Sequence, residues 1–95
     1  MTEEIPDEVA ALVDKMASEY VQSEYEIAEA LAEAEGPLTP DELVEETGYT
    51  ERTVEKRTGT LEDRLGGEPL FQRDEDGNPM LHPVLARAIR NGNDE

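Results

Sequence analysis

The feature that most limits how this sequence can fold is a set of start and stop signals around residues 39–50. Thr39 can cap a helix, Pro40 suits the first helical position, and Glu42 lies three residues after the cap. Gly48 is a residue that commonly follows the last turn of a helix. These signals predict a short helix over residues 40–47.

A second helix is expected almost immediately afterwards. Thr50 can cap it, and the pattern continues to about Leu65, where Gly66 ends it. Val54 and Leu61 fall on its apolar side. Two helices joined through so short a turn predict a helix-turn-helix.

After this motif the hydrophobic period changes from helical to strand-like. Residues 69–73 resemble a short strand, and Asp76-Gly77 or Gly77-Asn78 is a hairpin turn signal. Residues 79–81 are the expected return strand. We therefore predict a mainly α fold with one small β-hairpin.

Flanking helices are expected on both sides. Residues 6–22 carry a helical stripe, and Ser23 with Glu26 forms a capping-box pattern for a further helix that ends at Gly36-Pro37. The pattern leaves open whether residues 6–35 form two helices or one bent helix. Pro83 opens a closing helix to about Arg90, and the last five residues are expected to fray. The expected organisation is a flanking helix over 1–22, a core over 23–82 and a closing segment over 83–95.

The composition is strongly acidic. Asp and Glu number 25 against 8 Lys and Arg, which gives a formal net charge of −17. This excludes a generally basic nucleic-acid coat protein. The scarcity of Lys relative to Arg resembles proteins of halophiles that accumulate salt, where screening removes self-repulsion. The alternative is an ordinary acidic domain that is well solvated.

Several classes of function are not expected from the residues present. The chain has no cysteine and one histidine, so we expect no metal site and no cofactor. It has no glycine-rich phosphate loop and no serine–histidine arrangement typical of a hydrolase, so we expect no enzyme. It has no apolar run of membrane-spanning length and no export signal at its start, so we expect a cytoplasmic protein.

At this point the sequence resembles winged helix-turn-helix transcription regulators over residues 24–90. The stretch from Gly36 to Leu43, with Thr53-Val54 later, looks like the MarR-like and archaeal versions. The stretches 61–66 and 69–73 look like the passage into the wing in LysR-type regulators. Thr58, where a large aliphatic residue is usual, departs from both patterns. The resemblance implies a three-helix core with a two-stranded wing and a regulator that binds double-stranded DNA.

The charges of the predicted helix 51–65 agree with such a role. When Val54 faces inward at 100° per residue, carboxylates gather on one flank and cations and hydroxyls sweep across the outer face. Gly59 also falls outward, where it lets a phosphate approach or simply loosens the helix. The residues expected to contact DNA are Thr50, Arg52, Thr53, Lys56, Arg57, Thr60, Arg64 and Arg73. The alternative is a protein-binding module in a transcription or replication assembly.

The apolar stripes of the two end helices predict a homodimer, since a core of this size does not obviously cover both. A two-fold dimer would present two recognition helices to a pseudo-palindromic site. The residues expected at that interface are Val9, Leu12, Val13, Met16, Tyr20, Val84, Leu85 and Ile89. The alternative, weighed as nearly equal, is that the first helix folds back on its own core.

Overall fold

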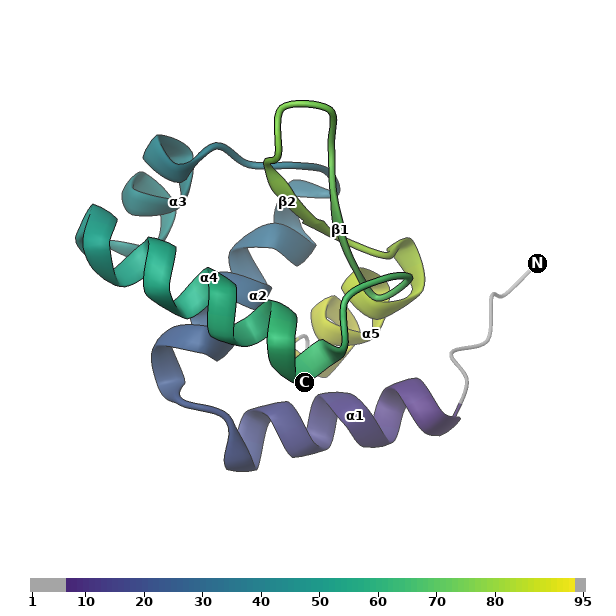
Figure 1. The fold of residues 1–95 in the computed structure, drawn as a ribbon. Helices are drawn as coiled ribbons and strands as arrows, with labels where there is room; N and C mark the ends of the chain where they lie inside the picture. Colours follow the sequence, from purple (N-terminus) through teal and green to yellow (C-terminus); the bar gives the residue numbers. More distant parts are fainter. Residues whose placement is uncertain (1–6, 94–95) are drawn as a thin grey trace.

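Five helices and one two-stranded hairpin make up residues 7–93, the part of the chain that the computed structural model describes (Figure 1). The helices are α1 (Asp7–Glu19), α2 (Gln22–Ala34), α3 (Pro40–Thr47), α4 (Glu51–Leu65) and α5 (Pro83–Asn93). The strands are β1 (Phe71–Arg73) and β2 (Pro79–Leu81), paired antiparallel. The prediction of a mainly α fold with a small hairpin is confirmed.

Helix α2 is the centre of the molecule, because it packs against α3, α4, α5 and β2. Figure 1 shows α1 along one side of the molecule and the hairpin projecting on the opposite side. Every element contributes to one apolar core. Its fully buried members include Met16, Ile27, Leu31, Leu43, Val54, Leu61, Phe71, Leu85 and Ile89. None of the described helices is long and apolar enough to cross a membrane.

Local signals set the two helices of the helix-turn-helix. The Thr39 hydroxyl accepts a hydrogen bond from the Glu42 backbone N–H, and the Glu42 carboxylate accepts one from the Thr39 N–H. Helix α3 then ends at Gly48, whose φ of 80° lies in the left-handed region that glycine tolerates. Thr50 caps α4 by accepting from the Thr53 N–H. The predicted bounds of both helices are confirmed.

The hairpin begins two residues later than predicted. Residues 68–70 form a turn, and the Phe71 N–H donates to the Gly67 carbonyl at 2.9 Å, so extended pairing starts only at Phe71. Phe71 pairs with Leu81, and both side chains are buried. A backbone hydrogen bond from Leu38 N–H to the Pro79 carbonyl ties β2 to the segment before α3. The hairpin is thus fixed to the core at its base.

The predicted start of α2 was wrong, whereas the helix does end just before Gly36, at Ala34. Ser23 does not cap the helix; Val21 holds the cap position without a side-chain hydrogen bond, and Ser23 is buried inside the first turn. At the other end Glu35, with a φ of 60°, is the left-handed residue rather than Gly36. At this end of α2 the side chain of Arg90 donates a hydrogen bond to the Ala32 carbonyl at 2.8 Å, which gives one of the last carbonyls of the helix a partner. Tertiary contacts therefore outweigh the local signals in α2.

The predicted dimer interface is also wrong for its central residues. Helix α1 packs against α5 of the same chain. This contact buries Val13, Met16, Leu85 and Ile89 in the chain's own core. Val9, Leu12 and Tyr20 pack at its edge, and Val84 is half-buried. The end helices cover each other because α5 follows the hairpin back across α2, which the sequence pattern did not reveal.

We predict that Met16→Ala lowers the free energy of unfolding by about 2–5 kcal/mol, because Met16 is fully buried between α1 and the core. Val21→Ala is the control, since Val21 is 40% exposed, and it should change stability by less than about 0.5 kcal/mol. Urea unfolding of both variants measures the difference. Equal effects, or an unfolding midpoint that rises with protein concentration, would contradict the intramolecular packing of α1.

Candidate nucleic-acid interface

The first half of α4 presents three basic side chains on the outer surface. Arg52 and Lys56 are exposed, and Arg57 is half-buried. Within residues 7–93 none of the three forms an ion pair with a carboxylate. In a chain with 25 acidic residues, three neighbouring cations without a paired carboxylate form an unusual surface. We call Arg52, Lys56 and Arg57 the basic patch of α4.

The first turn of α4 adds polar groups beside the basic patch. Thr50 is exposed and Thr53 is half-buried. The Thr50 hydroxyl donates to the Thr53 hydroxyl at 3.1 Å and accepts from the Thr53 backbone N–H at 3.2 Å. The amino end of a helix carries partial positive charge. An anion that approaches this end meets both the helix terminus and the side chains of the patch.

Gly59 lies one turn further along α4, and nothing in the described part of the chain requires a glycine there. A Cβ atom built on Gly59 would meet no heavy atom within 4 Å. Its φ is not in the left-handed region. Glycine inside a helix lowers stability by about 0.5–1 kcal/mol relative to alanine. Folding therefore gives no reason for its presence at this position.

Two residues that were expected to contact DNA have a partner inside the protein. The Thr60 hydroxyl donates to the carboxylate of Glu24 on α2. Arg64 forms an ion pair with the same carboxylate, its Nε atom lying 2.9 Å from Glu24 Oε1. The orientation of the two groups is not that of a hydrogen bond. The Glu24 side chain is fully buried, whereas that of Arg64 is 47% exposed. Thr60 and Arg64 thus fasten α4 to α2.

Sequence reasoning missed Glu24, although the sequence contains a signal for it. Glu24, Ile27, Ala28 and Leu31 follow the i, i+3, i+4, i+7 spacing of a buried helical stripe, and Glu24 occupies a position where an apolar residue is normal. A carboxylate at such a position requires a polar partner, because burying it alone is very costly.

Tyr20 lies next to the Arg64 side chain that pairs with Glu24. The guanidinium carbon of Arg64 lies 5.2 Å from the centre of the Tyr20 ring. Burial and the neighbouring carboxylates of Glu24 and Glu19 raise the pKa of Tyr20, and the positive charge of Arg64 partly opposes this rise. Arg64 is thus held between a buried carboxylate and an aromatic ring.

Arg73, the DNA contact predicted on the hairpin, is likewise engaged within the fold. Its Nη2 lies 2.9 Å from Glu62 Oε1 on α4, and its Nη1 donates to the Gly77 carbonyl at 2.7 Å. Its guanidinium carbon also lies 5.4 Å from the centre of the Phe71 ring. Arg73 therefore braces the hairpin against α4.

The tip of the hairpin is organised by a carboxylate. Asp74 Oδ1 accepts hydrogen bonds from the backbone N–H groups of Asp76 and Asn78, at 2.9 and 2.8 Å. These bonds, led by the one from Asn78, hold the pKa of Asp74 below its ordinary value. Asp74 remains negatively charged, and Glu75 and Asp76 beside it are exposed. The tip is therefore unsuited to approach a phosphate directly.

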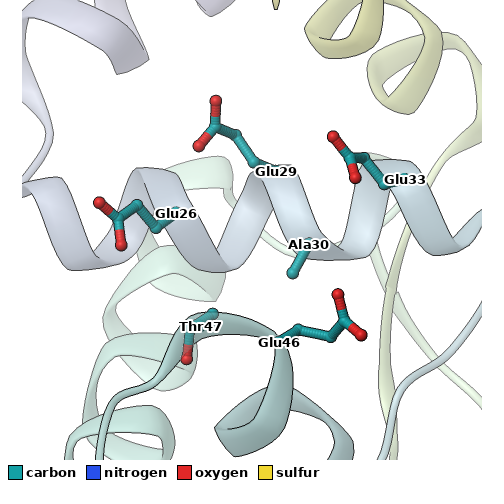
Figure 2. A pocket seen from close by; sticks show the side chains of 6 residues that line it. All are labelled: Glu26, Glu29, Ala30, Glu33, Glu46 and Thr47. Atoms are coloured by element: carbon teal, nitrogen blue, oxygen red, sulfur yellow. The ribbon is translucent and has the colours of Figure 1, made fainter.

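A second surface is acidic and lies between α2 and α3. Figure 2 shows Glu26, Glu29 and Glu33 along α2, and Glu46 and Thr47 of α3 on the side of α2 toward which Ala30 points. They line a cavity of about 230 Å³. The Glu26 carboxylate accepts a hydrogen bond from the Tyr49 hydroxyl, which raises the pKa of Tyr49. Among residues 7–93 no group of His, Asp or Glu is arranged to hold a metal ion.

We predict that Glu24→Gln lowers the free energy of unfolding by about 1–3 kcal/mol, because the buried charge that attracts Arg64 and Thr60 is lost. Glu33→Gln is the matched control on the same helix, since Glu33 is exposed, and its effect should stay within about 0.5 kcal/mol. Chemical denaturation measures both. A Glu24→Gln protein as stable as Glu33→Gln would show that the contact does not hold α4.

Compared with protein families, curated proteins and solved structures, this chain matches none. Its function is therefore inferred from its own residues. The chain has two surfaces of opposite charge, the basic patch at the start of α4 and the acidic cavity between α2 and α3.

Proposed function

We propose that this protein is a small regulator of the winged helix-turn-helix class that binds double-stranded DNA through the first half of α4. The observation that carries the proposal is the basic patch, whose three cations form no ion pair within residues 7–93. The remaining Arg side chains that were expected at the interface serve the fold. The proposed surface is therefore smaller than the sequence suggested: Thr50, Arg52, Thr53, Lys56 and Arg57.

The chemistry of these side chains suits a major groove. Arginine forms paired hydrogen bonds with guanine O6 and N7, and lysine neutralises phosphate. Arg52 and Lys56 are four residues apart and therefore share one face of α4. The hairpin would lie beside the duplex with its acidic tip away from the phosphates, or with cations between them. We expect the contact to operate in a cytoplasm rich in potassium salt.

The direct test reverses one charge at a time. We predict that Lys56→Glu weakens duplex binding by at least roughly tenfold, because it places a carboxylate against the phosphates. Lys15→Glu on α1 is the matched control, since both lysines are exposed, neither forms an ion pair within residues 7–93, and both changes alter the net charge equally. Fluorescence anisotropy in concentrated KCl, with a duplex selected from random sequence, measures binding.

The triple variant Arg52→Glu, Lys56→Glu, Arg57→Glu should abolish this binding. If it binds the selected duplex as well as the original protein, the basic patch is not the interface. If Lys15→Glu and Lys56→Glu weaken binding equally, the effect comes from net charge alone. Circular dichroism confirms that each variant is folded.

Gly59 supplies a test in which stability and binding move in opposite directions. We predict that Gly59→Ala raises the free energy of unfolding by about 0.5–1 kcal/mol, since the site has room for a Cβ. We also predict that it weakens duplex binding, because the added methyl stands between α4 and the phosphate backbone. Gly36→Ala, another site with room for a Cβ, should leave the affinity unchanged. Tighter binding by Gly59→Ala would show that Gly59 does not contact the duplex.

A second candidate function is docking to a basic protein in a transcription or replication assembly. The acidic cavity of Glu26, Glu29, Glu33 and Glu46 favours it, because charge complementarity steers such encounters. The same selection experiment separates the two functions. If no duplex is recovered in concentrated KCl, the docking function is preferred.

A further inference from the structure

A cavity of about 160 Å³ lies between α4, α3 and the turn end of the hairpin, which contributes Arg73, Gly77, Asn78 and Pro79. Its walls are largely apolar. Leu43 comes from α3, Val54 from α4 and Pro79 from β2, with Pro40 at the rim. An apolar cavity of about 150 Å³ is large enough for a six-membered ring. The space therefore suits one compact small molecule.

The cavity wall includes a buried hydroxyl that lacks a partner. Thr58 lines the cavity and is 6% exposed, and its Oγ1 has no hydrogen-bond partner among the described residues. Buried polar groups in folded proteins are nearly always paired. A threonine in a helix populates two χ1 rotamers, so a rotation can turn this covered hydroxyl toward a molecule in the cavity.

The charge at the cavity is negative. Two ionised side chains line it, Glu55 of α4 and Arg73 of β1. The charge of Arg73 is offset by Glu62, at 2.9 Å. Glu55 forms no ion pair within residues 7–93. A ligand that complements this cavity therefore carries a positive charge.

We propose that this cavity binds a small organic cation, a primary amine with a compact apolar body of about one ring. The ammonium group donates hydrogen bonds to the Glu55 carboxylate and the Thr58 hydroxyl. The apolar body packs against Leu43, Val54 and Pro79. This proposal stands on the cavity itself and does not require that the protein bind DNA.

Three probes with the same ring test the assigned chemistry: cyclohexylamine, cyclohexanol and cyclohexanecarboxylate. Binding is followed by the NMR shifts of the Leu43 and Val54 methyl groups, in the lowest KCl concentration at which the protein is folded. The amine should bind roughly tenfold more tightly than the alcohol, since its hydrogen bond to Glu55 is charge-assisted. The carboxylate should bind least. Equal affinities for the three probes, or no binding of the amine, would overturn the proposal.

Two variants and one control locate the contacts. Glu55→Gln should reduce the affinity for the amine to that for the alcohol, and Thr58→Val should weaken the binding of both. Glu51→Gln, a change of the same type one turn earlier on α4 and outside the cavity lining, should change neither. If Glu51→Gln weakens amine binding as much as Glu55→Gln, the amine is attracted by general surface charge and the proposed site is wrong. If Thr58→Val leaves both affinities unchanged, the hydroxyl does not contact the ligand.

Discussion

The contact of the buried Glu24 carboxylate with Thr60 and Arg64 is the constraint on which the position of α4 depends. It joins the first turn of α2 to the last turns of α4. Apolar packing of Val54, Leu61 and Leu65 holds α4 against the core but allows small rotations about its axis. The Glu24 carboxylate restricts the rotation of α4 much more strongly. Any rotation that separates Glu24 from Thr60 and Arg64 leaves a buried charge uncompensated. The outward direction of the basic patch follows from this.

Six of the eight basic residues divide into three that serve the fold and the three of the basic patch. Arg64 neutralises Glu24, Arg73 braces the hairpin, and Arg90 satisfies a carbonyl at the end of α2. Each of these contacts ties together segments that are distant in sequence. The basic patch has no comparable contact within residues 7–93. This division explains why counting positive residues on α4 overestimated the surface available to a nucleic acid.

The sequence predicted correctly those helix bounds that are set by residues close together in the chain. The bounds of α3 and α4 follow from caps at Thr39 and Thr50, whose partners lie three residues away. The cap predicted at Ser23 is not formed, and the neighbouring Glu24 pairs with Thr60, 36 positions along the chain. The interface role expected for Val13, Met16, Leu85 and Ile89 was wrong for a similar reason. An apolar stripe shows that a helix is covered, but it does not tell whether α5 of the same chain or a second molecule covers it.

The net charge of −17 and the proposed DNA-binding surface are compatible only when electrostatics is short-ranged. At physiological ionic strength the screening length is about 8 Å, so many carboxylates around α4 would repel a duplex together. At about 1 M salt it falls to about 3 Å, and only side chains in contact with the duplex contribute. Added salt then weakens the contacts of the basic patch but also removes the repulsion from the rest of the molecule. The affinity should therefore fall with salt less steeply than the number of phosphate contacts alone implies.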